Sequence, residues 1–237
     1  MTSIKDERGF NQIFIDSPAA RIRKKRRFDY MISKMDVNKP DLSILEIGSG
    51  TGEGISYISE VTNATGIGLD LSAKFIEISK TRYLNKNLNF IQANFNDSNI
   101  NEVLGGRKFD YIVGNGILHH LYYNLDSSLI NLKLLLKAQG KLIFIEPNLY
   151  NPYVAAIFSI PFLRRKTFLE PDEMAFSKTF IKRKCKMAGF ANIEVKIKDF
   201  LLPNIPDHLI NTTIKIGAIL EKTPLTVIAQ SLFITAE

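Results

Sequence analysis

The chain has 237 residues, of which 45% are hydrophobic and 23% charged, with a formal net charge of +7. This apolar content is enough to build a buried core and excludes an intrinsically disordered chain. Cys185 is the only cysteine, which excludes an intrachain disulfide and a cysteine-rich metal site, so we expect no metal and a reducing, cytoplasmic setting. No apolar run approaches the roughly 20 residues that span a bilayer, and residues 1–9 lack the apolar segment of a secretory signal.

Apolar patterning predicts strands and helices that alternate along the chain, as in an α/β domain with a largely parallel sheet. Strands are expected near 42–47, 65–70, 88–92, 109–113, 141–146, 191–198 and 227–236. Helices are expected near 18–36, 52–60, 72–84, 124–137, 178–188 and 206–221. Ser72 and Ser177 are suited to cap the helices that follow them, and Gly189 is suited to end the second of these helices.

The most informative segment is 44–52, where an apolar strand breaks into three glycines separated by one residue each. These glycines let the backbone turn sharply and approach a ligand closely. Asp70 ends the next strand 18 residues further on, where an acidic side chain binds a ribose hydroxyl in Rossmann-like folds. The dinucleotide fingerprint needs a glycine where Glu53 stands, and this carboxylate opposes a pyrophosphate at the helix N-terminus. The segment therefore predicts a nucleoside-containing cofactor other than a dinucleotide.

The pattern G-x-G-x-G after the acidic residue Glu46 resembles the first motif of the class I S-adenosylmethionine (SAM) methyltransferases. Four later segments resemble the strands and turns that follow this motif in the family: 66–72, 90–95, 109–121 and 136–147. The resemblance extends over about residues 40–150 and is specific, because the five segments come in order. It implies an α/β, Rossmann-like, seven-stranded and mainly parallel sheet with helices on both faces and an antiparallel last strand. It also implies that SAM is the cofactor.

The resemblance implies a cofactor site at the ends of the first four strands. Glu46 is expected to support the glycine loop and the cationic end of SAM, and Asp70 is expected to bind the ribose. Asn94 stands where the family usually has an aspartate beside the adenine amino group, and its amide oxygen can still accept a hydrogen bond. The full implied cofactor-binding set is Glu46, Gly48, Ser49, Gly50, Gly52, Asp70, Leu71, Asn94, Phe95 and Asn115.

Two adjacent histidines follow the predicted fourth strand and are the candidate catalytic residues. Methyl transfer from a sulfonium is an in-line displacement, so the enzyme mainly aligns acceptor and methyl, and an oxygen acceptor also needs a base. His119 and His120 are expected beside the cofactor, because sites of parallel sheets form at the carboxyl ends of the strands. His120 fits the family's pattern better, since it directly precedes an apolar residue. The alternative is that one histidine faces the methionine moiety structurally while the other is solvated.

The positive charge is concentrated in two segments that flank the predicted cofactor core. Residues 1–30 carry 8 basic and 4 acidic residues, and residues 164–186 carry 8 and 3, whereas the remainder carries 15 and 17. The first cluster, 21–27, has six basic residues in seven. These side chains either keep a helix surface in contact with water or bind phosphate or an anionic membrane. The second follows the apolar stretch 152–163, which suits either an element at a membrane interface or a packed lid.

We expect one methyltransferase domain over residues 1–237. Its expected parts are a basic helical cap at 1–38, a SAM-binding core at 39–147, an insertion or lid at 148–190, and C-terminal strands and a helix at 191–237.

The acceptor is expected to be a small molecule. The turn 114–117 lacks the N/D-P-P-Y/F tetrapeptide of methyltransferases that act on base amines, and the sequence most resembles the branch that acts on quinone precursors, lipids and sugars. The basic flanks and the apolar insertion favour an amphiphilic or phosphorylated, lipid-linked acceptor and peripheral contact with an anionic inner membrane surface. Two alternatives stay open: RNA modification, with nucleic acid as the partner, and a non-catalytic SAM-binding partner subunit.

Overall fold

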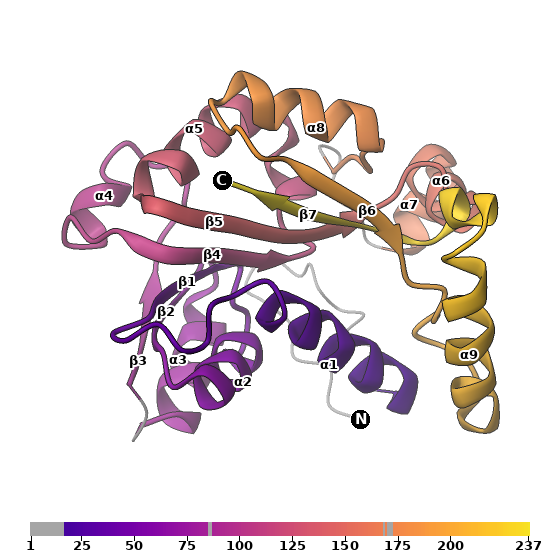
Figure 1. Ribbon diagram of the computed structural model, residues 1–237, viewed down its shortest axis with the longest axis horizontal. Helices are drawn as coiled ribbons and strands as arrows, with labels where there is room; N and C mark the ends of the chain where they lie inside the picture. The colour runs from indigo at the N-terminus through magenta and orange to yellow at the C-terminus, as the bar shows by residue number, and fades with distance from the viewer. Residues whose placement is uncertain (1–16, 85–86, 168, 170–172) are drawn as a thin grey trace.

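The computed structural model describes residues 17–84, 87–167, 169 and 173–237, and a seven-stranded sheet forms its centre (Figure 1). The strand order is β3-β2-β1-β4-β5-β7-β6, with β7 antiparallel to both neighbours and the other pairs parallel. The predicted fold class is therefore confirmed. The strands are β1 (Ser43–Ile47), β2 (Thr65–Asp70), β3 (Leu88–Gln92), β4 (Phe109–Asn115), β5 (Leu136–Pro147), β6 (Glu194–Lys198) and β7 (Ser231–Ala236).

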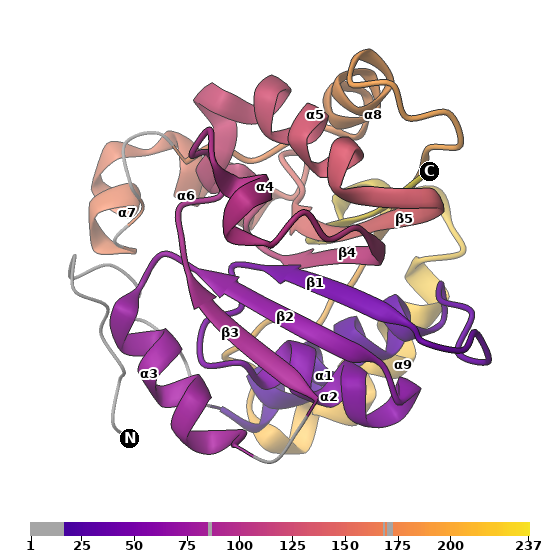
Figure 2. The ribbon, with the colours of Figure 1, turned by 90° about the vertical axis from the view of Figure 1, so that its left-hand side faces the viewer.

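Helices cover both faces of this sheet (Figure 2). The α-helices are α1 (Pro18–Ile32), α2 (Glu53–Thr62), α3 (Ala73–Arg82), α4 (Ile100–Val103), α5 (Leu125–Leu135), α6 (Pro152–Ser159), α7 (Pro161–Lys166), α8 (Lys178–Met187) and α9 (Ile210–Leu220). α4, α5 and α8 lie on one face, and α1, α2 and α3 lie on the other, with α9 packed beside α1. Short 3-10 helices lie at Leu118–Asn124, Asp207–Leu209 and Pro224–Ile228.

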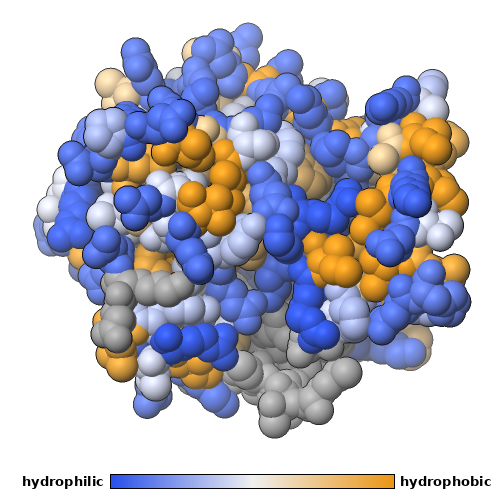
Figure 3. All heavy atoms as spheres, turned by 60° about the horizontal axis from the view of Figure 1, so that its bottom comes forward, coloured by the Kyte–Doolittle hydropathy of each residue, from blue (hydrophilic) through white to orange (hydrophobic). Residues whose placement is uncertain are grey.

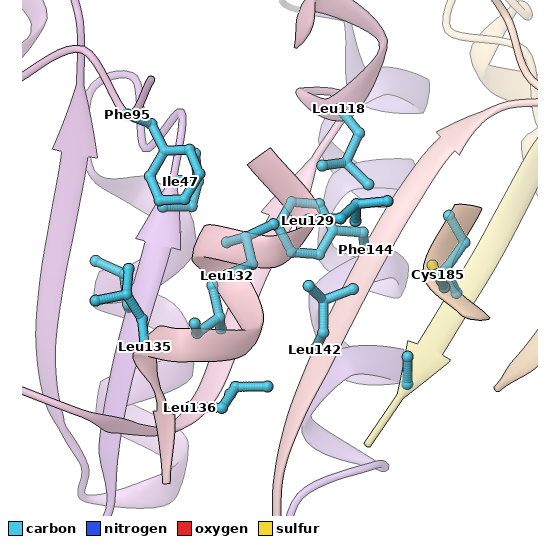
Figure 4. Packing of buried hydrophobic residues seen from close by; sticks show 14 of the residues in the cluster. Ile47, Phe95, Leu118, Leu129, Leu132, Leu135, Leu136, Leu142, Phe144 and Cys185 are labelled. Carbon is cyan, nitrogen blue, oxygen red and sulfur yellow. The ribbon is translucent and has the colours of Figure 1, made fainter. Parts of the chain in front are cut away.

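Two apolar clusters fill the spaces between the sheet and its helical layers, because the central strands are buried on both faces. Leu45 points into one cluster and Ile44 into the other, and Leu142 and Ile143 alternate in the same way along β5. Figure 4 shows the first cluster, where the leucines of α5 meet β5 and Cys185 of α8. Burial raises the pKa of the Cys185 thiol to about 12, so this thiol is a packing group.

The fifth strand begins earlier than its apolar pattern predicts. β5 starts at Leu136 instead of residue 141, directly after α5 ends. Leu136 pairs with Phe109 before a bulge shifts the register of the two strands. A Cβ at Gly140 would lie 2.9 Å from the Phe109 carbonyl oxygen, so the glycine permits this close approach of the two backbones.

The bounds of other elements also differ from the predicted ones. The last strand begins at Ser231 instead of residue 227, because Pro224 starts a 3-10 helix in that stretch. β6 begins at Glu194 instead of residue 191, and α1 ends at Ile32 instead of residue 36. These differences leave the topology of the sheet unchanged.

The predicted helix caps are confirmed. Ser72 Oγ accepts a hydrogen bond from the Phe75 N–H, and Ser177 Oγ accepts one from the Phe180 N–H, both over 3.2 Å. Gly189 follows α8 with a φ of 89°, the left-handed conformation that glycine adopts after a helix.

The segment between β5 and α8 forms two short helices. Pro152 and Pro161 occupy the first positions of α6 and α7, where the fixed φ of proline suits a helix start. α8 follows and packs against α5, with Ile181 and Cys185 buried in the core. Within the described ranges, every helix is too short or too polar to pass through a bilayer.

Candidate active site

The loop after β1 has a backbone conformation that only glycine adopts readily. Gly48, Gly50 and Gly52 have φ angles of 66°, 52° and 80°. A Cβ at Gly48 would lie 2.7 Å from Ile117 Cδ1, whereas a Cβ at Gly50 would meet no atom of the described residues within 4 Å. The loop is therefore closely packed at Gly48 and open at Gly50, where a ligand can approach the backbone.

Asp70 holds this loop against the end of β2. Its Oδ2 accepts a hydrogen bond from the Gly50 N–H over 2.8 Å, and its Oδ1 accepts one from the Ser72 N–H over 2.9 Å. Ser49 Oγ is buried beside this contact and finds no hydrogen-bond partner among the described residues. Leu71 follows the acid and is 45% exposed. The carboxylate predicted to bind ribose and the glycine loop thus form one unit.

Glu46 lies beneath the loop and contacts the first turn of α2. Its side chain is buried, and Oε2 accepts a hydrogen bond from the Ile55 N–H over 2.7 Å. Gly54 makes room for it, since a Cβ there would lie 2.2 Å from Glu46 Oε1. Burial, opposed by the hydrogen bond from the Ile55 N–H and assisted by the nearby charge of Asp70, raises the pKa of Glu46 to about 8. This carboxyl group therefore joins the end of β1 to the start of α2.

In the segment after β3, the side chain of Asn94 is exposed to solvent and the ring of Phe95 is buried. Asn94 is exposed, and its Oδ1 accepts a hydrogen bond from the Asn96 N–H over 3.0 Å. Phe95 is 4% exposed and belongs to the same core cluster as Ile47 (Figure 4). Of the two residues predicted here, Asn94 has the side chain that is accessible to a ligand.

Two of the six basic residues between 21 and 27 point into the domain. Arg27 donates from Nη1 to Asn115 Oδ1 over 2.9 Å and from Nη2 to Ser231 Oγ over 2.6 Å. Arg23 and Arg27 both pair with Asp199, at 2.8 and 3.4 Å. Burial, followed by the charge of Arg23, lowers the pKa of Arg27 to about 9. The spacing of four residues places both arginines on one helical face, but the sequence does not reveal their buried partner.

A buried carboxylate at the end of β5 holds His119. Glu146 Oε2 lies 2.8 Å from His119 Nδ1, and Glu146 is 1% exposed. The same carboxylate accepts hydrogen bonds from the N–H groups of Ile117, Leu118 and His119 over 3.0, 2.8 and 3.3 Å. Glu146 therefore fixes both the backbone of this turn and the imidazole ring. The sequence offers a single signal for it, an acidic residue that ends an apolar strand.

His120 faces a second buried carboxylate. Its Nδ1 lies 3.0 Å from Glu173 Oε1, and Oε2 of the same group lies 3.8 Å from His119 Nε2. The centroids of the two imidazole rings are 4.2 Å apart. Glu173 is 3% exposed, whereas the His120 side chain is 30% exposed. The third histidine, His208, is exposed near α9 and lies outside this group.

The residues predicted to bind the cofactor come together at the carboxyl ends of β1 to β4. Three features of this edge fit a nucleoside: the open backbone at Gly50, the Ser49 Oγ that has no partner among the described residues, and the carboxylate of Asp70. Glu53 occupies the first turn of α2 and pairs with Lys24 at 2.6 Å, so an acidic group stands where a dinucleotide needs room for its phosphates. This set of residues suits the uncharged ribose and adenine and the cationic sulfur of SAM.

Comparisons with known proteins give the same class. Residues 45–142 match the family model described as a methyltransferase domain. The chain is 26% identical over 186 residues to the highly reducing polyketide synthase pks5 of Leptosphaeria maculans. The aligned region covers 71% of this chain and 7% of that protein. The chain thus spans a small part of this curated relative.

Solved structures show the same fold. A SAM-dependent methyltransferase from Archaeoglobus fulgidus matches with a TM-score of 0.61 and 17% identity, over 91% of this chain and 93% of that one. The CurJ carbon methyltransferase matches with a TM-score of 0.62 and 19% identity, over 93% of this chain and 55% of that one. At these identities the likeness concerns the fold. The match of residues 45–142 to a methyltransferase domain, together with the shared fold, supports a class I SAM-dependent methyltransferase.

Proposed function

We propose that the protein transfers the methyl group of SAM to a small-molecule acceptor from which His119 removes a proton. The observation that carries this proposal is the 2.8 Å contact between His119 Nδ1 and the buried carboxylate of Glu146. The likeness to two highly reducing polyketide synthases, both at 26% identity, supports a small-molecule acceptor.

Glu146 suits His119 to the role of a base. A carboxylate at Nδ1 keeps the hydrogen on that nitrogen, leaves the lone pair of Nε2 for the acceptor, and stabilises the imidazolium that forms. His120 has its Nδ1 at Glu173 and a more exposed side chain. We therefore favour His119 as the base, although the family pattern favours His120, and we keep His120 as the second candidate.

The proposed base lies next to the end of β4. A Cβ at Gly116, the residue after Asn115, would lie 3.6 Å from His119 Cε1. SAM, when bound, supplies an electrophilic methyl group on a good leaving group. The chain's own task is to align the acceptor and to receive its proton at Nε2 of His119. The acceptor atom gains a methyl group and loses one proton, which fits an acidic carbon between two carbonyls or a hydroxyl.

An apolar surface with a basic border supports an amphiphilic acceptor and contact with anionic lipid. Tyr153 of α6 and Phe162 of α7 are 50% and 63% exposed, and Arg165 and Lys166 follow in the last turn of α7. Figure 3 shows apolar side chains gathered on the right-hand side of the molecule, the side on which α6, α7 and α9 lie in Figure 1. Salt-dependent binding to anionic vesicles tests this part of the proposal.

RNA modification is the weaker alternative. Binding to RNA needs basic side chains that are available to phosphates, and several in the cluster 21–27 are paired within the protein. The residues of this cluster that form ion pairs with acidic side chains are Arg23, Lys24, Lys25 and Arg27.

Methyl-labelled SAM tests the proposed function. The purified protein is incubated with a host extract, with a β-ketoacyl thioester as a carbon acid, and with a catechol as a hydroxyl acceptor. We expect label in the organic phase, and a loss of about 10²-fold or more in turnover for His119→Gln. The control His208→Gln removes an exposed histidine and keeps turnover. Label in an RNase-sensitive fraction, or SAM binding without transfer to any fraction, contradicts the proposal.

A further inference from the structure

We propose that His119, His120 and Glu173 bind one divalent transition-metal ion, with zinc as the best-suited probe. One potential ligand atom of each residue lies within 4.8 Å of the other two. His119 Nε2 and His120 Nδ1 are the nitrogens that face the Glu173 carboxylate, so we assign them as ligands. The expectation of no metal rested on the scarcity of cysteine, whereas this group uses imidazole and carboxylate ligands only.

The distances suit a tetrahedral ion after small side-chain movements. In tetrahedral zinc sites the metal lies about 2.0–2.2 Å from each nitrogen or oxygen, which places neighbouring ligand atoms ~3.3 Å apart. His120 Nδ1 and Glu173 Oε1 are 3.0 Å apart, and His119 Nε2 and Glu173 Oε2 are 3.8 Å apart. The backbone supports the arrangement, since the Met174 N–H donates to the His119 carbonyl over 3.4 Å and ties the two segments together.

A second carboxylate orients the first histidine as metal sites require. Histidines that bind metals commonly donate their other ring N–H to a carboxylate, which fixes the ring and strengthens the ligand. Glu146 stands at Nδ1 of His119 at 2.8 Å, on the opposite side of the ring from Nε2. His119 is therefore held with Nε2 toward Glu173, independently of any ion.

Burial and charge favour a dication here. Glu146 and Glu173 are 1% and 3% exposed, and two buried carboxylates are stabilised by positive charge between them. The His120 side chain is 30% exposed, so this ligand of the proposed site is in contact with solvent. Two imidazoles with one carboxylate select zinc, nickel or copper over magnesium or calcium, which prefer oxygen ligands alone.

An ion at this site controls the proposed base. The ion occupies the lone pair of His119 Nε2, which is the atom that would receive the proton of the acceptor. Zinc is therefore expected to inhibit methyl transfer, and a chelator is expected to restore it. This regulatory consequence rests on the proposed function, whereas binding of the ion does not.

Zinc titration of the full chain, first stripped with a chelator, tests the site by calorimetry. We expect one ion per chain, and visible absorption when cobalt(II) replaces zinc. His120→Ala and Glu173→Gln should each weaken zinc binding at least about tenfold, and Glu146→Gln about 10–100-fold. The matched control His208→Gln removes the exposed third histidine and should leave affinity unchanged. Circular dichroism verifies that each variant is folded.

The outcomes separate the two proposals. The metal site is overturned, whatever the methyltransferase activity, if zinc does not bind stoichiometrically. It is also overturned if His208→Gln loses zinc binding while the other variants keep it. Zinc binding with the expected losses, but no methyl transfer to any acceptor in the presence of chelator, overturns the proposed function and leaves the metal site standing.

Discussion

Arg27 Nη1 donates a hydrogen bond to Asn115 Oδ1 over 2.9 Å and so joins helix α1 to the end of β4, 88 residues later. The bond occupies the amide oxygen of Asn115 and directs its NH2 group away from the arginine. Because Asn115 belongs to the proposed cofactor-binding set, Arg27 of the basic helix orients one residue of the proposed SAM site.

Arg27→Lys is expected to weaken SAM binding by about tenfold, since one hydrogen bond from a charged group contributes about 1.5 kcal/mol. A lysine places one point charge there and cannot hold Asn115, Ser231 and Asp199 together as the planar guanidinium does. Calorimetric titration with SAM measures the effect. Arg26→Lys is the control, because Arg26 is exposed on the same helix. Equal affinity in both variants contradicts a positioning role.

His119→Gln and Glu146→Gln are expected to lower turnover without weakening SAM binding. A general base contributes roughly 10²–10⁴-fold, and the two residues act as one unit, so the double variant should be little slower than His119→Gln alone. Single-turnover rates at saturating SAM give the comparison. A double variant whose loss equals the product of the single losses would show that the two residues act independently.

Glu46→Gln is expected to flatten the pH dependence of stability. Burial raises the pKa of Glu46 to about 8 in the folded chain, above the value of about 4.3 in an unfolded chain. The folded state thus keeps a proton that the unfolded state releases, and the free energy of unfolding falls as pH rises from about 4 to 8, by at most about 1.4 kcal/mol per pH unit. Glutamine still accepts the Ile55 N–H and carries no charge.

Urea denaturation between pH 5 and 8 measures this slope. The matched control is Glu53→Gln, which removes an exposed carboxylate seven residues later and should retain the decline seen in the unaltered chain. An unchanged slope in Glu46→Gln means that the buried carboxyl group ionises normally in the folded protein.

Gly50→Ala and Gly48→Ala are expected to separate binding from folding. Both positions have positive φ, which costs a non-glycine residue roughly 1–2 kcal/mol. A Cβ at Gly50 enters open space, so the variant should fold and lose SAM affinity, whereas at Gly48 it meets Ile117 at 2.7 Å and should lower the melting temperature further. Thermal melts with SAM titrations test both. A larger fall in melting temperature for Gly50→Ala than for Gly48→Ala contradicts the assignment of Gly50 to the open, ligand-facing part of the loop.

Local patterns predicted the parts of the site that lie within one β-α-β unit. Gly48, Gly50 and Gly52 precede Asp70 by 22, 20 and 18 residues, and the structure joins the loop to Asp70 through the Gly50 N–H. The alternation of strand and helix patterns along the chain was likewise enough to predict a largely parallel sheet. These features depend on neighbours in sequence, which a single sequence displays.

Contacts between distant segments could not be predicted. Glu146 reaches His119 across 27 positions, and Asp199 reaches Arg23 across 176. Neither acid stands in a pattern that names its partner, because pairing depends on where the sheet places each strand end. The start of β5 was missed for a related reason, since Leu136 is a strand residue only through its pairing with Phe109.

The contacts of α1 bear on the order in which the protein folds. Arg27 binds Ser231, which is synthesised 204 positions later, and the Tyr30 ring meets Phe233 edge-on at 4.7 Å. Both partners belong to β7, which enters the sheet between β5 and β6. During synthesis α1 therefore leaves the ribosome long before this part of its docking surface exists, and contacts so distant in sequence form slowly. The orientation of Asn115 by Arg27 is consequently among the last features to be established in a newly made chain.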